Sequence, residues 1–127
     1  MIVVDASAAI SALLNAGPAR AALADEQAHA PHLIDPEVAN ALRRGVARSL
    51  IEPGDARSAL ERWRRLGLLR HATFPLLERV WQLRDNLSAY DASYVALAEA
   101  LGCALLSADA RIARSPEITC PVTIVPR

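Results

Sequence analysis

The first fourteen residues read MIVVDASAAISALL (Met1–Leu14), and this stretch decides the fold that the rest of the chain must fit. The β-branched run Ile2-Val3-Val4 predicts a short buried strand. The run stops at Asp5, and the Ala- and Leu-rich segment from Ala6 to Leu14 predicts a helix. A strand that turns directly into a helix begins a β-α unit, here with an acidic residue at the turn.

Helices and short strands alternate along the remainder of the chain. Proline, glycine and acidic residues mark the expected helix starts, among them Asp35-Pro36, where Asp35 is the predicted N-cap and Pro36 the first helical residue. Further helices are expected over residues 18–25, 35–49, 53–67, 75–85, 88–101 and 109–114, and further strands over residues 68–73, 103–106 and 122–125. This alternation predicts a single α/β domain over residues 1–127, in which about seven helices flank a central parallel sheet of four to five short strands.

Composition excludes several kinds of enzyme. All 14 basic residues are arginine, so the sequence lacks the lysine of a P-loop, a protein kinase or a Schiff-base enzyme. Cys103 and Cys120 form no C-x-x-C motif, and His29, His32 and His71 have no ligand spacing, so a zinc site is not expected. Core or surface roles are expected for all five residues. Most of the few aromatic residues are also expected in the core, which disfavours extensive base stacking.

Length and hydropathy indicate a protein that folds in water. A chain of 127 residues with 53% hydrophobic positions can bury a core without disulfides or a structural metal. No window approaches the roughly 20 apolar residues of a membrane span, and the N-terminus lacks the basic start of a signal peptide. We therefore expect no membrane association and a cytoplasmic location.

Four acidic residues stand at four junctions between elements. Asp5 and Asp109 follow expected strands, whereas Glu37 and Asp91 fall in the first turns of expected helices. Ligands of open parallel sheets bind beyond the carboxyl ends of the strands. If the strands before Asp5 and Asp109 are neighbours, their ends lie about 4.8 Å apart. The four carboxylates are therefore expected to form one acidic pocket.

Helix capping is the alternative explanation for each acid taken alone. Asp5 and Asp109 are placed to cap the helices that follow them, and Glu37 is placed to complement a helix dipole. Ser88-x-x-Asp91 fits a capping box. Capping preference by itself does not account for four acids at four separate junctions, so the joint pattern favours a common site.

The helix that carries Glu37 also carries a basic stripe. Arg44 and Arg48 lie within about 20° of Glu37 on a helical wheel, and Val38, Leu42 and Val46 occupy the opposite sector. Guanidinium groups that lead away from an acidic pocket suit the phosphates of a polyanion. An ordinary solvated face explains the same stripe, and both interpretations remain open at this point. On the helix that carries Asp91, the expected buried stripe is Tyr90, Tyr94, Leu97 and Leu101.

Four segments together carry a family resemblance that spans the chain. The sequence resembles the PIN-domain ribonucleases, and in particular the VapC toxins of bacterial toxin–antitoxin pairs. The matching segments are VVDAS (residues 3–7), PEVANALRR (residues 36–44), YDASYVALAE (residues 90–99) and LLSADARIA (residues 105–113).

The resemblance implies a PIN-like three-layer fold and a metal-dependent endoribonuclease that hydrolyses RNA phosphodiester bonds. It also implies a cognate VapB-type antitoxin, for which the apolar first four helices offer a docking surface, and a homodimer. By this resemblance the acids gather Mg²⁺ or Mn²⁺, hard cations that prefer carboxylate ligands. The implied metal ligands and catalytic residues are Asp5, Glu37, Asp91 and Asp109, and the implied supporting residues are Ser7, Asn40 and Ser107.

The remaining charge is compatible with an RNA partner. Without the four candidate acids, 14 arginines face 10 acids, a net charge of +4. Each candidate arginine is equally explained as a solvated surface charge, and Arg84 is also placed to pair with Asp85 or with a site acid. The candidate RNA-binding residues are Arg44, Arg48, Arg84, Arg111 and Arg114.

Two other functions are weighed against the nuclease. An aspartate-nucleophile phosphatase needs a second Asp two positions after the first and a lysine downstream, whereas this chain has Ser7 there and no lysine. The non-enzymatic alternative is a PIN-like binding module whose acidic pocket receives an arginine of a partner protein. Metal-dependent cleavage of RNA distinguishes the nuclease from this module.

Overall fold

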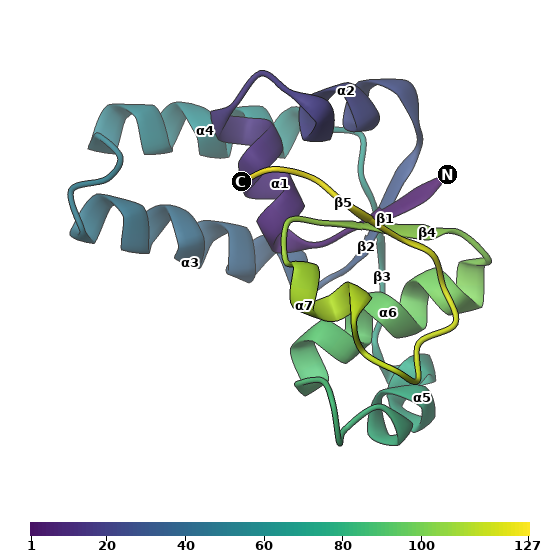
Figure 1. The fold of residues 1–127 in the computed structure, drawn as a ribbon. Coiled ribbons are helices and arrows are strands. Elements are labelled where there is room, and N and C mark those ends of the chain that lie inside the picture. Colours follow the sequence, from purple (N-terminus) through teal and green to yellow (C-terminus); the bar gives the residue numbers. More distant parts are fainter.

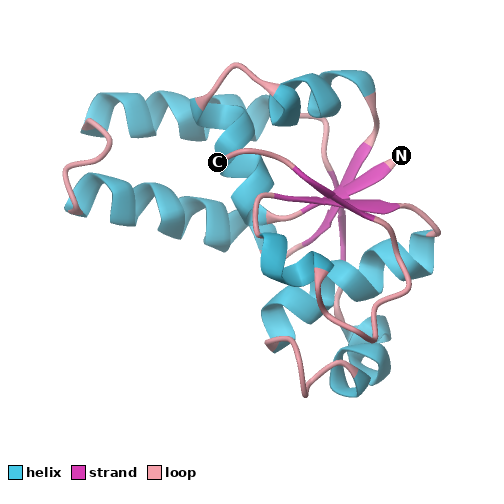
Figure 2. Ribbon diagram, viewed as in Figure 1, coloured by secondary structure: helices cyan, strands magenta, loops and turns pink.

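The computed structural model describes all 127 residues, and its centre is a five-stranded sheet in which every pair of neighbouring strands is parallel. The strand order is β3-β2-β1-β4-β5, and helices lie on both sides of the sheet (Figures 1 and 2). The predicted α/β architecture is thus confirmed. The strands are β1 (Ile2–Val4), β2 (Ala28–Pro31), β3 (Leu69–His71), β4 (Ala104–Ser107) and β5 (Val122–Ile124).

Seven α-helices and one short 3-10 helix surround the sheet. The predicted number of about seven helices is thus confirmed. Helix α6 contacts β1, β2 and β4, while α3 and α4 form a helical hairpin that projects away from the sheet (Figure 1). None of the helices has the length and apolar character that a bilayer span requires. The helices are α1 (Ala6–Leu14), α2 (Pro18–Asp25), α3 (Ile34–Ala47), α4 (Pro53–Arg65), the 3-10 helix η1 (Phe74–Leu76), α5 (Leu77–Gln82), α6 (Ala89–Leu101) and α7 (Ala110–Ala113).

Strand β2 is the element that the sequence did not predict. Its residues, Ala-His-Ala-Pro, have no β-branched side chain, so local propensity gives no strand signal. All four residues are nevertheless buried, between β1 on one side and β3 on the other. Pairing on both edges therefore overrides propensity in this segment.

Helix α3 begins two residues before the predicted first helical residue, Pro36, and the predicted capping role of Asp35 is wrong. The helix begins at Ile34, and Leu33 at the N-cap makes no side-chain cap bond. The Asp35 carboxylate instead accepts hydrogen bonds from Trp63 Nε1 at 2.8 Å and Arg70 Nε at 2.6 Å. These bonds tie α3 to α4 and β3, so a tertiary contact replaces the local cap.

The expectation that most aromatic side chains lie in the core is wrong, because Phe74, Trp81 and Tyr90 are exposed. Tyr90 is 62% exposed because the first turn of α6 lies outside the core, which begins at Ala92. Trp81 on α5 is 65% exposed, and the guanidinium of Arg84 lies over its ring, 4.6 Å from the ring centroid. The remainder of the predicted stripe on α6 is confirmed for Tyr94 and Leu97, which are buried.

Candidate functional site

The four candidate acids meet at the carboxyl edge of the sheet. Strands β1 and β4 are neighbours, and the strand order reverses between them, which is where open α/β sheets bind ligands. Asp5 directly follows β1, and Asp109 lies two residues after β4. Glu37 enters from the first turn of α3 and Asp91 from the first turn of α6. Each carboxylate is close enough to at least two of the others to repel them electrostatically.

Two serine hydroxyls join the turns after β1 and β4. Ser7 Oγ donates to Asp5 Oδ1 at 2.6 Å and accepts from the backbone N–H of Ala108 at 2.9 Å. Ser107 is fully buried, and its Oγ accepts from the backbone N–H of Asp109 at 2.9 Å. The two hydroxyls are 3.4 Å apart. They therefore fix the two turns that carry Asp5 and Asp109 relative to each other.

Asp5 is both a helix cap and a member of the acidic pocket. Its Oδ1 accepts from the backbone N–H of Ala8 at 2.9 Å, which caps α1 as the capping interpretation expects. The side chain is also buried, and burial raises the pKa of Asp5, with the charge of Asp109 adding to the shift. The two interpretations of this residue are therefore compatible.

Glu37 is held by a tyrosine that the sequence analysis assigned only to the core. The hydroxyl of Tyr94 donates to Glu37 Oε1 from the buried face of α6. Burial raises the pKa of Glu37, the hydrogen bond from Tyr94 opposes that rise, and the charge of Asp91 adds to it. Tyr94 lies one helical turn after Asp91, on the same side of α6, and this spacing is the signal that could have identified it.

Asp91 is partly exposed at the start of α6. The hydroxyl of Ser88 accepts from the backbone N–H of Asp91 at 3.1 Å, so half of the predicted capping box is present. Burial raises the pKa of Asp91, and the charges of Asp5 and Asp109 raise it further. Asp91 thus has two like charges near it, and the charge of Arg111 opposes their effect on its pKa.

Asp109 differs from the other three acids because an arginine neutralises it. Arg111 donates to both carboxylate oxygens and lowers the pKa of Asp109. The Asp109 side chain also accepts from the backbone N–H of Arg111 at 3.0 Å and so caps the short helix α7. Asp109 is therefore both a cap and a member of the pocket, like Asp5.

The donor set fits a hard divalent cation, although the side chains are turned toward protein partners. No three His, Cys, Asp or Glu side chains are grouped closely enough to ligate one ion in this conformation. Asp5 faces the N-terminus of α1, Glu37 faces Tyr94, and Asp109 faces Arg111. Burial and mutual repulsion leave three of the carboxylates with raised pKa values, a cost that a cation would relieve.

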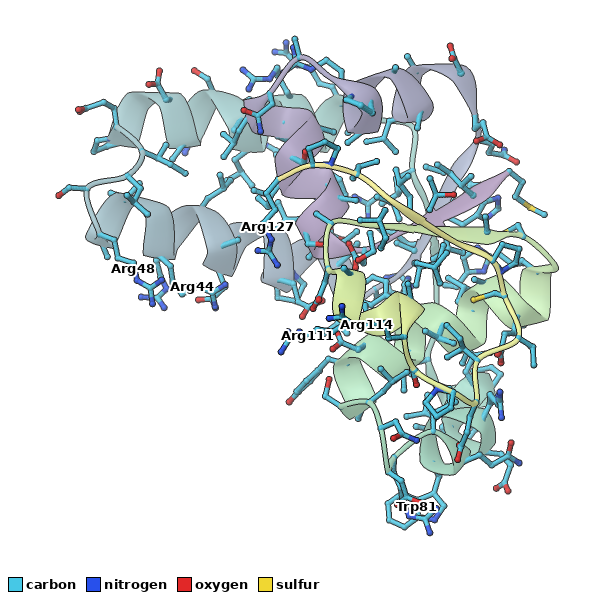
Figure 3. All side chains as sticks on the ribbon, in the orientation of Figure 1. Arg44, Arg48, Trp81, Arg111, Arg114 and Arg127 are labelled. Atoms are coloured by element: carbon cyan, nitrogen blue, oxygen red, sulfur yellow. The ribbon has the colours of Figure 1, made fainter.

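Most of the candidate arginines lie around this edge of the molecule. Figure 3 shows Arg44 and Arg48 along α3 and Arg111 and Arg114 at α7. Arg84 behaves differently, because it stacks on Trp81, donates to the Trp81 carbonyl at 3.0 Å and forms no ion pair. The expectation that Arg84 pairs with Asp85 or a site acid is therefore wrong.

Two side chains that the sequence analysis did not assign to the site flank Glu37. One is Tyr94, and the other is Arg127, which lines a hollow of about 410 Å³ together with Glu37, Asn40 and Arg44. Asn40 Oδ1 accepts from Arg43 Nε at 2.9 Å. No local pattern in the sequence predicts the position of Arg127, because it depends on where the C-terminal segment crosses the fold.

Comparisons with known proteins give a consistent result. The PIN domain family profile matches residues 2–118 of the chain. Ribonuclease VapC9 of Mycobacterium tuberculosis is 56% identical over 127 residues, which cover 100% of both chains. The crystal structure of PAE2754 from Pyrobaculum aerophilum is similar with a TM-score of 0.72 and 22% identity, over 95% of this chain and 81% of that one. VapBC2 from Rickettsia felis, bound to a DNA fragment from their promoter, is similar with a TM-score of 0.64 and 14% identity, over 96% and 98% of the two chains.

Proposed function

Because this chain belongs to the PIN-domain family and is a VapC-type ribonuclease toxin, we propose that its active site is the pocket of Asp5, Glu37, Asp91 and Asp109 and that it requires Mg²⁺ or Mn²⁺. The observation that carries this proposal is the meeting of four carboxylates from four elements at the switch point of the sheet. Three of them have raised pKa values because of burial and mutual repulsion.

Each residue has a defined part in this proposal. When bound, the divalent ion polarises a phosphoryl oxygen and lowers the pKa of a water molecule. Asp5 and Asp91 hold the principal ion, directly or through water. Glu37, oriented by Tyr94, completes the ligand set or accepts a proton from the attacking water. Asp109, which now pairs with Arg111, would serve a second ion. Ser7 and Ser107 keep the turns of Asp5 and Asp109 in register.

The test is RNA cleavage by the purified full-length chain. We expect cleavage with Mg²⁺ or Mn²⁺, no cleavage with EDTA, and no cleavage by Asp91→Ala with either metal. Asp55→Ala is the matched control, because Asp55 also lies in the first turn of a helix but is exposed and outside the pocket. Cleavage that survives Asp91→Ala contradicts the assignment of the active site.

One observation favours the second candidate, a binding module that receives an arginine of a partner protein. Arg111 already occupies Asp109, so this pocket does accept a guanidinium group. If the purified chain binds an arginine-containing partner segment with high affinity but cuts no RNA with either metal, the binding module is the correct function. The two candidates are thus separated by one cleavage assay and one titration.

A VapB-type antitoxin is the proposed protein partner, and its proposed docking surface is a groove among the first helices. The groove is about 980 Å³ in volume and is lined by residues of α1, α2 and α4 and by the loop between α3 and α4. Its wall includes Leu50, which is 77% exposed. We expect Leu50→Asp to prevent co-purification with the antitoxin and to leave RNA cleavage unchanged. Co-purification that is unaffected by this substitution contradicts the placement.

A homodimer is the proposed assembly. Phe74, Leu77 and Trp81 are exposed apolar side chains of η1 and α5, and Trp81 lies far from the arginines of α7 (Figure 3). Light scattering of the purified chain should give twice the mass of one chain, and Trp81→Glu should give the mass of a monomer. A monomeric wild-type protein contradicts this proposal.

RNA recognition is proposed to use the arginines around the pocket, with the phosphate backbone as their main target. Arg44, Arg48, Arg111 and Arg114 are the candidates near the pocket, and Arg84, which stacks on the more distant Trp81, is the fifth. A cytoplasmic location follows from this proposal, because the substrate is cellular RNA. Mapping the cut sites across total RNA would identify the substrate.

A further inference from the structure

A second hollow adjoins the acidic pocket on the side of α3. Its volume is about 410 Å³, within the range of small ligand sites, and it lies between α1, α3 and the C-terminal segment. Glu37 belongs to both the hollow and the acidic pocket. Any group bound in the hollow is therefore next to the proposed cleavage position.

Two arginines line this hollow without a partner in the protein. Arg44 comes from α3, about two turns after Glu37 on the same face of the helix, and Arg127 comes from the C-terminal segment. Neither guanidinium group donates a hydrogen bond or forms an ion pair within the chain, although Arg20, Arg62, Arg70 and Arg79 all do. Two unpaired guanidinium groups at one hollow form a site for an anion with several oxygen acceptors.

Two hydrogen bonds hold the C-terminal segment in place, and they determine the position of Arg127. The backbone N–H of Val125 donates to the carbonyl of Ser107 at 2.8 Å, which extends the pairing of β5 with β4. Ser11 Oγ on α1 then donates to the carbonyl of Pro126 at 2.5 Å. These bonds lead the chain from the edge of the sheet across α1 and place Arg127 at the hollow (Figure 3).

The wall of the hollow has the mixed character that a nucleotide requires. Ile10 and Leu14, one turn apart on α1, and Ala41 on α3 provide an apolar surface for the face of a base. Asn40 also lines the hollow, and since its Oδ1 is occupied by Arg43, its amide N–H groups remain free to donate to the edge of a base.

We infer that this hollow binds one nucleotide of the RNA substrate beside the cleaved bond, with its phosphate held between Arg44 and Arg127 and its base against Ile10, Leu14 and Asn40. The inference rests on the proposed nuclease function and extends it. It makes Arg127 a substrate-binding residue and Asn40 a residue that selects the base next to the cut.

The first experiment measures RNA binding without cleavage. Fluorescence anisotropy is recorded with a short labelled single-stranded RNA at several salt concentrations, in the Asp5→Asn background. Arg44→Gln and Arg127→Gln should each weaken binding roughly tenfold and should reduce the salt slope by about 0.7. Arg65→Gln is the control, because Arg65 on α4 is also exposed and unpaired but lies outside the hollow. If all three variants bind alike, the inference is wrong.

The second experiment tests the base contact in the active chain. Cut sites are mapped for the wild type, Asn40→Ala and Arg127→Gln. Asn40→Ala should relax the base preference at one position beside the cut, and Arg127→Gln should raise KM more than it lowers kcat. An unchanged cut pattern and KM in both variants, in a wild type that cleaves, overturns the nucleotide site alone. A wild type that does not cleave RNA overturns the proposed function instead.

Discussion

Arg111 donates two hydrogen bonds to the carboxylate of Asp109, from Nη2 to Oδ2 at 2.8 Å and from Nε to Oδ1 at 3.1 Å. The arginine side chain is 80% exposed, so it can leave without breaking any packing in the core. The guanidinium therefore occupies one of the four proposed metal ligands, and we expect this ion pair to oppose metal binding.

Loss of Arg111 should make metal binding tighter. In Arg111→Gln both carboxylate oxygens of Asp109 become free and one repelling positive charge disappears. We expect the affinity for Mn²⁺, measured by titration calorimetry, to rise roughly two- to fivefold, which is modest because the ion pair is exposed. Arg114→Gln removes the same charge at the end of α7, where Arg114 has no contact with Asp109, and should change the affinity less. Equal or weaker binding by Arg111→Gln contradicts competition.

Asp5→Asn should raise the melting temperature of the metal-free protein and abolish cleavage. The asparagine can still cap α1, and it removes an ionised group whose pKa is raised by burial. A raised folded-state pKa means that the charged form lowers stability above that pKa. The advantage of Asp5→Asn over the wild type should therefore shrink as the pH falls through the raised pKa toward 3.8.

Asp5→Ala separates the cap from the charge. It removes the same charge but also the hydrogen bond to Ala8, so it should melt below Asp5→Asn by roughly 4 °C, given a cap worth about 1 kcal/mol. His29, whose pKa is lowered by burial, adds the same pH dependence to the stability of the wild type and of both variants. It therefore cancels when their melting temperatures are compared at one pH. If Asp5→Asn melts below the wild type at neutral pH, the ionised carboxylate stabilises the fold and the expected effect of its charge is wrong. If Asp5→Ala melts with Asp5→Asn, the cap contributes nothing at this position.

Tyr94→Phe should slow cleavage while the chain stays folded. The substitution removes the donor that orients Glu37 and leaves the ring in the core. We expect kcat to fall roughly tenfold with little change in KM, and the pH below which activity is lost to rise, because the hydrogen bond lowers the pKa of Glu37. Steady-state kinetics across pH checks both. A pH profile identical to that of the wild type would show that Tyr94 only fills space.

Metal affinity should fall as the solution becomes acidic. Ligation requires ionised carboxylates, and the pKa values of Asp5, Glu37 and Asp91 are raised from 3.8, 4.5 and 3.8. The affinity should therefore begin to fall at a higher pH than it would for isolated carboxylates, with proton release when the metal binds. Calorimetry in buffers of different ionisation enthalpy measures that release, which should be smaller in Asp91→Asn. Affinity that is constant down to the ordinary carboxylate pKa contradicts the prediction.

Asp35→Ala should destabilise the fold without changing the chemistry. It leaves the indole N–H of the buried Trp63 without an acceptor and frees Arg70. We expect the free energy of unfolding in urea to fall by about 2 kcal/mol, since the pair with Arg70 is partly exposed and adds little. Asp55→Ala, which breaks no hydrogen bond, should cost much less. A stable Asp35→Ala protein would indicate that the tie between α3, α4 and β3 is dispensable.

The sequence by itself determined the elements whose signals are local. The β-branched run before Asp5 and the apolar run before Asp109 place two acids at strand ends, and Gly102 ends α6 in the left-handed conformation that it adopts easily. The buried face of α3, with Val38 and Leu42, is also as predicted. Periodicity and capping act over a few neighbouring residues, so one sequence is enough to read them.

Only the tertiary structure decided the features that depend on contacts between distant segments. Residues Ala28–Pro31 form a strand because β1 and β3 pair with them. Asp35 does not cap α3 because its carboxylate accepts hydrogen bonds from Trp63 and Arg70. Tyr94 donates to Glu37, which is 57 positions away in sequence. Arg127 lines the hollow beside the pocket because Val125 and Pro126 are hydrogen-bonded to Ser107 and Ser11. Burial and hydrogen bonds stabilise these contacts, and they form between parts of the chain that only folding brings together. Local propensity therefore does not predict them.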